Sequence, residues 1–419
     1  MCYNRFSGDS MQVGDSINLT IENLDHQGRG IGHYLDKTIF VSNALPGEVV
    51  KVIVDKLKKN IAEAHVEEFK CVSEERIISS CPYFNQCGGC DLLHLTYDRQ
   101  LLFKENKIRE IMHRFCNYDF KINNIIRSDL QYNYRNKVTF QINNNIGFYE
   151  RGSNRIVPVS DCKIISDKTN QVLKLLNSCS FKRHLKSFIV RSNVMNEILL
   201  DIKIDDKIDP SYINKYFLDI ADSIIINDKV TYGSGQIIEQ LGNYKFLISP
   251  KSFFQVNTKQ TLKLYNLIKK YADLTGKEVL LDLYCGTGTI GIYLSSKCKE
   301  VVGIEINESA VKDANRNKDI NEIDNVRFIC GDALKQIAKT KIKPNIVIVD
   351  PPRAGLNKND IKNIINLKAE KIIYVSCDPI TLARDLNILS ETYKIKELTP
   401  VDMFPNTSHV ECVCVLNRR

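Results

Sequence analysis

The sequence lacks tryptophan, long apolar runs and an apolar leader, and each absence excludes a class of protein or of contact. Among 419 residues there is no Trp, so any stacking on nucleic-acid bases would fall to the 18 Tyr and 17 Phe. No apolar run approaches the ~18 residues of a membrane helix, which excludes a protein that spans a membrane by helices. The first residues, MCYNRFSGDSMQVGDS, have no apolar stretch after a basic cluster, so we expect no cleaved secretory signal and a cytoplasmic location.

The composition is that of an ordinary globular chain. Hydrophobic residues make up 43% and charged residues 26%, which allows a sizeable core and excludes general disorder. The length predicts two to four domains at about 100–200 residues each. Lys and Arg number 58 against 50 Asp and Glu, and the net charge of +8 is compatible with a polyanionic partner but does not identify one.

The 14 cysteines are better explained as reduced thiols, metal ligands or nucleophiles than as disulfides, because the chain is long and has no leader. Cys412 and Cys414 alternate with valines in HVECVCVL and are expected to pack on one face of a strand. A second set of cysteines has the pattern of a tetrathiolate metal site. Its spacing alone fits either Zn²⁺ or a [4Fe–4S] cluster. That set is Cys81, Cys87, Cys90 and Cys162.

Short apolar segments and glycine turns predict a small β-barrel over residues 1–72. Within it, Lys56, Lys58 and Lys59 fit either a solvated strand end or contact with an RNA backbone. After a cysteine-bearing loop, LTYDRQLLFKENKIREIMHRFC shows apolar residues at helical spacing and predicts an amphipathic helix. Its apolar positions are Leu102, Ile108, Ile111, Met112 and Phe115.

The rest of the chain predicts a mostly β region followed by an α/β region. From about residue 125 to 250, KVTFQINNNIGFY, SFIVRSN, EILLDIKI and YKFLISP fit strands, with one helix around SDKTNQVLKLLNSC. From about residue 258, strand candidates alternate with helical patterns, which is typical of a doubly wound parallel sheet. Near the start of the β region, aromatic, basic and amide side chains interleave, which suits RNA binding but also an ordinary strand entry. These are Tyr132, Tyr134, Arg135, Asn136 and Lys137.

The first α/β strand ends in DLYCGTGTIG at 282–291, a strand, glycine turn and helix start typical of nucleotide-cofactor sites. Glu305 closes the next strand, where a carboxylate can accept hydrogen bonds from ribose hydroxyls, and Asp332 follows the third, where an adenine would lie. Because an acid at the turn, Asp282, suits the cationic groups of AdoMet better than a pyrophosphate, we expect AdoMet rather than NAD. Helix capping is the structural alternative for Glu305 and Asp332.

Two later strand ends carry reactive groups. NIVIVDPPRAGL places Asp350, and KIIYVSCDPITLARDL places Cys377, at the carboxyl ends of strands, where ligands bind in open α/β sheets. The helix that follows Cys377 is expected to lower the pKa of the thiol, and a plain buried cysteine is the alternative.

A thiol in that position suits methylation of uracil. Attack of a thiolate on C6 activates C5 for methylation, after which a base must remove the C5 proton. Glu411, which precedes an apolar strand, is the candidate base because partial burial would raise its pKa. Asp350 is the candidate to hold the pyrimidine edge.

These motifs together resemble the RNA (uracil-5-)-methyltransferase family. The resemblance is carried by FFQVN at 253–257, DLYCGTGTIG at 282–291, DPPRAGL at 350–356, SCDP at 376–379 and HVEC at 409–412, in the family's order. The N-terminal segment resembles the TRAM domain, so the likeness covers nearly the whole chain.

The resemblance implies roles for individual residues. Cys377 would be the nucleophile and Glu411 the proton-abstracting base. Around the Gly286 turn, the AdoMet and uracil site would be lined by Gln255, Tyr284, Glu305 and Asp350, with Asp332 near the adenine. The resemblance also implies a [4Fe–4S] cluster on Cys81, Cys87, Cys90 and Cys162, and a helix near 93–124 that packs with the catalytic domain.

We therefore expect a TRAM OB-like β-barrel (1–72), a mostly β central domain that carries the iron–sulfur cluster and binds RNA (73–92 and 125–255), and a Rossmann-like class I methyltransferase domain (93–124 and 256–419). The expected activity is methyl transfer from AdoMet to C5 of a uridine in RNA. By analogy alone, 23S ribosomal RNA is the favoured substrate. No membrane and no obligate protein partner are implied.

Three alternatives stay open. A tRNA uracil-5-methyltransferase would use the same chemistry on another RNA. An RNA cytosine-5-methyltransferase is disfavoured, because that class carries a Cys beside the proline motif and this chain has Asp350 there. A non-catalytic RNA-binding iron–sulfur protein is disfavoured, because it would have no need for Cys377, Asp350 and Glu411 together.

Overall fold

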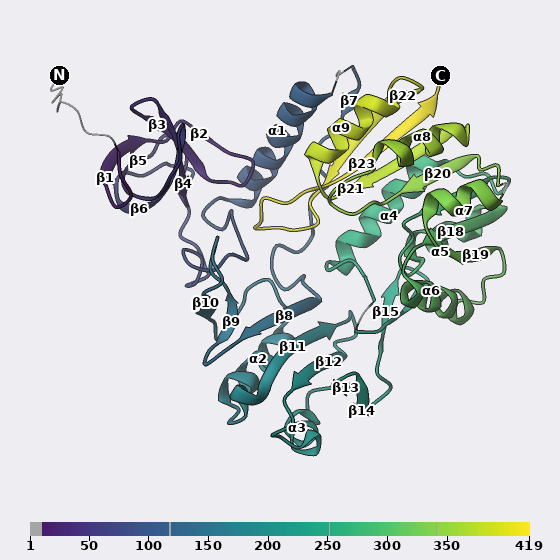
Figure 1. Ribbon diagram of the computed structural model, residues 1–419, viewed down its shortest axis with the longest axis horizontal. Helices are drawn as coiled ribbons and strands as arrows, with labels where there is room; N and C mark the ends of the chain where they lie inside the picture. Colours follow the sequence, from purple (N-terminus) through teal and green to yellow (C-terminus); the bar gives the residue numbers. More distant parts are fainter. Residues whose placement is uncertain (1–10, 117–118, 251, 341) are drawn as a thin grey trace. The chain divides into compact units, whose positions relative to one another are not determined.

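The computed structural model describes residues 11–116, 119–250, 252–340 and 342–419, and these form two compact units. Unit 1 comprises the described residues up to Gln100 together with Asn406–Ser408, and unit 2 comprises the remainder. Figure 1 labels the elements of each unit. The first ten residues, which bear on the secretory-signal expectation, lie outside the described residues. None of the described helices is both long and apolar enough to cross a membrane.

Unit 1 holds a six-stranded sheet in the order β1-β5-β6-β4-β3-β2. Neighbouring strands are antiparallel except β4 and β6, which run parallel. Side chains alternate between core and solvent, as in β1, where Ile17 and Leu19 are buried. The strands are β1 (Ser16–Thr20), β2 (Asn23–Leu24), β3 (Gly30–Tyr34), β4 (Lys37–Ser42), β5 (Val49–Leu57) and β6 (Ile61–Cys71).

A buried ion pair closes this sheet against the segment that follows it. The Glu48 side chain is fully buried, and its Oε1 lies 2.5 Å from Nε of Arg76. Arg76 also donates to the carbonyl of Asn43, at 2.7 Å. The carboxylate is therefore paired, as a buried charge must be for a stable fold.

The predicted amphipathic helix is α1 (Tyr97–Phe115), and the prediction of its buried face is partly wrong. Ile108, Ile111 and Met112 are buried, as expected, and belong to the core of the C-terminal sheet. Leu102 and Phe115 are 43% and 42% exposed. Two polar residues one turn apart, Gln100 and Lys104, are buried on the helix instead.

The central region of unit 2 is a seven-stranded sheet in the order β10-β9-β8-β11-β12-β13-β14, with β15 and β16 as a separate hairpin (Figure 1). It confirms the mostly β prediction and the helix around SDKTNQVLKLLNSC, which is α2, but a second helix, α3, was not predicted. The strands are β8 (Lys137–Ile142), β9 (Ile146–Tyr149), β10 (Ile156–Pro158), β11 (Leu185–Ser192), β12 (Ile198–Ile204), β13 (Ser223–Ile226), β14 (Lys229–Tyr232), β15 (Ile237–Leu241) and β16 (Tyr244–Ile248). The helices are α2 (Asp167–Ser178), α3 (Pro210–Phe217) and the short 3₁₀ turn η1 (Lys182–His184).

The C-terminal region is the predicted doubly wound sheet, in the order β19-β18-β17-β20-β21-β23-β22-β7. Every strand is parallel to its neighbours except β23, which lies antiparallel between β21 and β22. The strands are β7 (Lys121–Ile122), β17 (Val279–Leu283), β18 (Glu300–Glu305), β19 (Val326–Cys330), β20 (Ile346–Val349), β21 (Lys371–Ser376), β22 (Tyr393–Val401) and β23 (Glu411–Arg418). The helices are α4 (Thr258–Ala272), α5 (Thr289–Leu294), η2 (Ser295–Lys297), α6 (Glu308–Ile320), α7 (Ala333–Thr340), α8 (Lys358–Asn366) and α9 (Pro379–Leu389).

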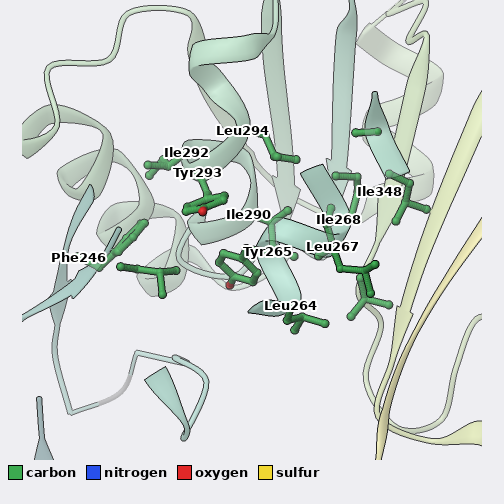
Figure 2. Packing of buried hydrophobic residues seen from close by; sticks show 14 of the residues in the cluster. Phe246, Leu264, Tyr265, Leu267, Ile268, Ile290, Ile292, Tyr293, Leu294 and Ile348 are labelled. Atoms are coloured by element: carbon green, nitrogen blue, oxygen red, sulfur yellow. The ribbon is translucent and has the colours of Figure 1, made fainter. Parts of the chain in front are cut away.

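Helices cover both faces of this sheet, because its central strands are apolar on both sides. Residues of α4 and α5 pack on one face, and Figure 2 shows Tyr265, Ile268 and Ile290 of this layer near Ile348 of β20. Residues of α1, α8 and α9 pack on the other face. Cys412 and Cys414 are fully buried in that second layer, which confirms the prediction that both pack on one face of a strand.

Candidate active site

The glycine turn follows β17 and leads into α5. Its first two glycines have positive φ, 54° at Gly286 and 76° at Gly288. A Cβ on Gly288 would lie 2.3 Å from Cζ of Phe328, so this glycine is needed for packing inside the protein. A Cβ on Gly286 would have no atom within 4 Å, so this part of the turn faces open space that a ligand can enter.

Asp282, the last but one residue of β17, is completely buried beneath the turn. Its Oδ2 accepts a hydrogen bond from the Gly291 N–H at 3.1 Å, and within the described residues its Oδ1 has no hydrogen-bond partner. Burial, together with the charges of Asp350 and Glu305, raises the pKa of Asp282 to about 8. The carboxyl therefore stabilises the start of α5 through one oxygen, and its other oxygen is available to accept a hydrogen bond from a ligand.

Glu305 and Asp332 lie at the ends of the next two strands but make different contacts. Glu305 accepts hydrogen bonds from the N–H groups of Gly286 at 3.1 Å and Asn307 at 2.8 Å, which ties it to the glycine turn. Asn307, not Glu305, caps α6. Asp332 accepts from the Lys335 N–H at 3.1 Å and so caps α7. The capping alternative thus describes Asp332 and not Glu305.

Tyr284 lies in the turn with φ at 63°, a left-handed conformation that is rare for a bulky residue. Its hydroxyl hydrogen-bonds to Asp360 in the first turn of α8, and burial with the nearby carboxylates raises its pKa. Strained backbone that the surroundings hold in place is a feature of ligand sites.

Gln255 is buried in an irregular segment before α4. Its carbonyl accepts a hydrogen bond from Nδ2 of Asn136 at 3.0 Å. Nearby, the Phe253 carbonyl accepts from Oγ1 of Thr287, in the glycine turn, at 3.1 Å. The FFQVN motif is therefore attached both to the central sheet and to the glycine turn.

The topology brings Cys377, Asp350 and Glu411 to one edge of the sheet. Asp350 and Cys377 follow the carboxyl ends of the parallel strands β20 and β21. The antiparallel register pairs Ser376 with Cys412, so the next residues outward are Cys377 and Glu411. The charges of Glu411 and Asp350 both act on the Cys377 thiol. Glu411 reaches this edge only because β23 runs against its neighbours.

The expectation that a helix lowers the pKa of Cys377 is wrong. The carboxylate of Asp378 accepts from the N–H groups of Ile380 at 2.9 Å and Thr381 at 3.0 Å, so it caps α9 in place of the thiol. Burial and the Glu411 and Asp350 carboxylates raise the pKa of Cys377 to about 11. The resting site therefore favours the thiol, not the thiolate.

Glu411 and Asp350 are themselves inclined to hold protons. Glu411 is 4% exposed, and burial with the nearby Asp350 raises its pKa to about 8, which confirms the expected direction. Burial likewise raises the pKa of Asp350 to about 7. Three acidic groups thus share one enclosed edge, a pattern concentrated at functional sites.

Arg353, in the DPPRAGL loop, is a site residue that the sequence reasoning missed. It hydrogen-bonds to the Cys377 thiol, and its charge lowers the pKa of both Cys377 and Glu411. Its carbonyl accepts from Oγ1 of Thr381 at 3.1 Å, and Nη2 of Arg384 donates to the Ala354 carbonyl at 3.0 Å, so α9 holds the loop. The available signal was its place three residues after Asp350.

The four predicted metal ligands are divided between the units. Cys81, Cys87 and Cys90 belong to unit 1 and Cys162 to unit 2. Sγ of Cys87 accepts from the Gly89 N–H at 3.4 Å. Across the part of the chain that the structure describes, no group of three or more His, Cys, Asp or Glu side chains is placed to hold a metal ion. The structure therefore does not support the predicted iron–sulfur cluster.

The aromatic and basic segment before β8 is only partly available to RNA. Tyr132 is exposed, but Tyr134 is 5% exposed and its hydroxyl donates to the Pro405 carbonyl at 3.0 Å, so the alternative of an ordinary strand entry describes Tyr134. Lys137 is partly buried beside Arg191 and Arg135, which lowers its pKa to about 8.

Comparisons with known proteins agree with this geometry. The family model described as tRNA (Uracil-5-)-methyltransferase matches residues 224–419, and the TRAM domain model matches residues 11–66. An uncharacterized RNA methyltransferase of Clostridium tetani is 38% identical, with 97% of each chain covered. One of Staphylococcus aureus is 35% identical over 95% of this chain and 97% of its own.

A solved structure extends the similarity to the whole fold. The Pyrococcus abyssi tRNA (uracil-54, C5)-methyltransferase, in complex with S-adenosyl-L-homocysteine, superimposes with a TM-score of 0.78. The two chains are 29% identical, and the match covers 95% of this chain and 99% of the other. Taken with the carboxyl, thiol and glycine-turn geometry, these similarities show that the chain belongs to the RNA (uracil-5-)-methyltransferase family of AdoMet-dependent enzymes.

Proposed function

We propose that the protein transfers the methyl group of AdoMet to C5 of a uridine in RNA, through a covalent bond between Cys377 and C6 of the uracil. The observation that carries the proposal is the antiparallel β23, which puts the buried carboxyl of Glu411 beside the Cys377 thiol at the carboxyl edge of the sheet. A nucleophile and a base side by side, next to a glycine turn, suit addition, methyl transfer and elimination in one site.

In this mechanism the protein's own groups move two protons. The Cys377 thiol loses its proton to water and Sγ bonds to C6, which makes C5 electron-rich; Arg353 favours the thiolate. AdoMet supplies an electrophilic methyl group. The Glu411 carboxylate then accepts the C5 proton, and the electron pair of that C–H bond restores the C5–C6 double bond as the C6–Sγ bond breaks. Asp350 would hold the uracil edge.

The glycine turn fits AdoMet in chemistry and in space. The open space beside Gly286 admits a ligand, and among the described residues the buried Oδ1 of Asp282 accepts no hydrogen bond. Glu305 is proposed to accept the ribose hydroxyls. Gln255 and Tyr284 are proposed to contact the methionine part of AdoMet and the uracil. Asp332 is proposed to lie near the adenine.

Large-subunit 23S ribosomal RNA is the substrate that we propose, from the combination of a TRAM domain with the cysteine pattern. Transfer RNA is the second candidate, because the Pyrococcus abyssi relative acts on tRNA. Both candidates use the same site residues, so the choice depends on RNA contacts outside the catalytic edge.

The [4Fe–4S] cluster stays a prediction that rests on cysteine spacing and on the family resemblance. No step of the proposed reaction depends on it. Iron, sulfide and zinc analysis after anaerobic purification tests it. Four iron and four sulfide per chain would support the cluster, and a protein free of both would exclude it.

Tritium release from RNA labelled at C5 of uridine tests the proposed function directly. We expect release that depends on AdoMet, from unmodified ribosomal RNA or from unmodified tRNA, and the responding fraction identifies the substrate. RNA labelled at C5 of cytidine is the control for the cytosine alternative. Intact AdoMet binding without release from uridine would contradict the proposal.

A further inference from the structure

The connection between β22 and β23, residues 402–410, leads directly into Glu411 and is built in an unusual way. It has no regular secondary structure, yet all its side chains are buried except those of Phe404, which is partly exposed, and His409, which is exposed. A buried irregular segment must find hydrogen-bond partners for its backbone outside itself. Whatever supplies those partners also fixes where β23 begins.

In unit 2, side chains from three separate elements bind successive carbonyls of this connection. Nδ2 of Asn257, the residue that caps α4, donates to the Met403 carbonyl at 3.2 Å. Nζ of Lys104 on α1 donates to the Phe404 carbonyl at 3.0 Å. The Tyr134 hydroxyl donates to the Pro405 carbonyl at 3.0 Å.

Unit 1 contains the middle of the same connection and holds it in the same manner. The Asn406 N–H donates to Oε1 of Gln100 at 2.9 Å, and the Ser408 N–H donates to Oδ2 of Asp91 at 2.9 Å. Asn406 has φ at 68°, so the chain turns sharply at the residue that Gln100 holds.

The most costly of these contacts is the ion pair at the start of the connection. Nζ of Lys104 lies 2.5 Å from Oδ1 of Asp402, and both side chains are fully buried. Lys104 lies on the buried side of α1, one turn before Ile108, where the amphipathic pattern calls for an apolar residue. Apolar replacement of a buried ion pair often preserves stability, so stability alone does not explain the pair.

We propose that Lys104 and Asp402 are positioning residues that fix the β22–β23 connection so that the Glu411 carboxylate is aimed at the C5 proton. This inference rests on the proposed function, in which Glu411 is the base. The pair anchors the first residue of the connection and, through Phe404, its third. A small displacement at the start of β23 would move the base relative to C5, and a misplacement of about 1 Å costs roughly 100-fold in rate.

The test removes both charges together, because Lys104→Met alone would leave the buried Asp402 carboxylate without the Lys104 ammonium and could prevent folding. The variant is Lys104→Met/Asp402→Asn. Arg76→Met/Glu48→Gln, which removes another largely buried pair, is the matched control for lost stability. Tyr134→Phe deletes one hydroxyl that binds the same connection. Glu411→Gln is the reference for a missing base.

Each variant is measured for unfolding midpoint, AdoMet affinity, kcat per AdoMet-binding site and the fraction of enzyme trapped as a covalent RNA adduct. We expect Lys104→Met/Asp402→Asn to lower kcat by about 10- to 100-fold and to accumulate adduct, with AdoMet affinity unchanged, because proton removal follows adduct formation. Tyr134→Phe should shift both readouts in the same direction by a smaller factor. Arg76→Met/Glu48→Gln should lower the unfolding midpoint and leave kcat and the adduct fraction at wild-type values.

The outcomes separate this inference from the proposed function. If Glu411→Gln traps adduct while Lys104→Met/Asp402→Asn keeps wild-type kcat without adduct, the positioning inference alone is overturned. If Glu411→Gln turns over freely, the assignment of the base fails and the inference fails with it. Equal losses of kcat in both double variants would mean that the pair acts through stability only, which also overturns the inference.

Discussion

The glycine turn after β17 and the strand ends of β20, β21 and β23 lie on the same sheet edge, but their polar groups make different contacts. At the glycine turn, carboxylates accept hydrogen bonds from backbone N–H groups, as Asp282 does from Gly291 and Glu305 from Gly286. At the other strand ends, burial is the main cause that raises the pKa values of Cys377 and Glu411, neighbouring carboxylates add to it, and the opposing charge comes from Arg353.

In the proposed mechanism, the glycine turn binds the cofactor and the strand ends around Cys377 carry out the proton transfers. Backbone hydrogen bonds hold a carboxylate oxygen in one place, which suits the binding of a ligand in a fixed position. A thiol and two carboxyls in one enclosed space have pKa values that depend on each other and on whatever enters. Substitutions at the glycine turn should therefore change AdoMet binding. Substitutions at the strand ends around Cys377 should change the chemical steps and their pH dependence.

The largest expected effect is that of Cys377→Ala. Without Sγ no bond to C6 forms and C5 stays unreactive, so we expect no measurable methylation. AdoMet affinity, measured by equilibrium binding, should stay at the wild-type value, because the glycine turn is untouched. Methylation by this variant would contradict the covalent mechanism. It would also remove the distinction between the glycine turn and the strand ends around Cys377.

Glu411→Gln should slow turnover by about 10²–10⁴-fold, the usual contribution of a general base. Because the thiol cannot leave until the C5 proton is removed, a covalent protein–RNA adduct should accumulate. Denaturing electrophoresis with labelled RNA measures it, and Cys377→Ala/Glu411→Gln, which cannot form the adduct, is the control. A Glu411→Gln enzyme with normal turnover and no adduct would assign the base role elsewhere.

The pH dependence should distinguish the two ends more finely. Glu411 must be ionised to accept the C5 proton, and its pKa is raised to about 8, so the rate at which a preformed adduct loses the C5 proton should rise about tenfold per pH unit below pH 8 and flatten above it. Formation of the adduct should keep rising above pH 8, because the pKa of Cys377 is raised to about 11. Arg353→Met removes the cation that lowers this pKa, and the rise should move to higher pH. Glu305→Gln is the control, because it changes the glycine turn and should leave the pH at which the rate rises unchanged. A flat wild-type profile between pH 6 and pH 9 would contradict the assignment.

The smallest effects should come from the two neighbouring glycines, which test the binding end. Gly286→Ala points its Cβ into open space, so we expect weaker AdoMet binding and a loss of about 1 kcal/mol of stability from the left-handed backbone. Gly288→Ala sets its Cβ against Phe328 and should lose about 2–3 kcal/mol. Urea unfolding and AdoMet titration measure both. Equal AdoMet affinities for the two variants would argue against a ligand beside Gly286.

Much of the fold was predictable because its signals are local. Strand and helix periodicity gave the doubly wound sheet, the strands of unit 1 and α1. The buried face of α1 was not predictable, since Leu102 is exposed and Lys104 is buried. The ion-pair partner of Lys104, Asp402, lies 298 residues away, and no local sequence pattern indicates the pairing.

The site shows the same limit. Cys377 and Asp350 could be placed at strand ends from the sequence, but the pKa of Cys377 moves opposite to the prediction because Asp378 takes the helix cap. Tyr134 lies in a segment whose composition suits RNA contact, yet the fold buries its side chain against Pro405. For Tyr134, the group that decides its role, the Pro405 carbonyl, lies on a distant segment. For Cys377, the neighbouring Asp378 competes for the same helix N–H groups.

The sequence by itself determined the family, the elements and the reactive residue types, because motifs such as DLYCGTGTIG, DPPRAGL and SCDP carry their chemistry in consecutive residues. Tertiary structure alone decided that Glu411 meets Cys377. The antiparallel insertion of β23 beside β21 brings the start of one strand to the end of another, and no spacing along the chain encodes that choice. The pKa values followed from it, since burial and neighbouring charges exist only once the strands are assembled.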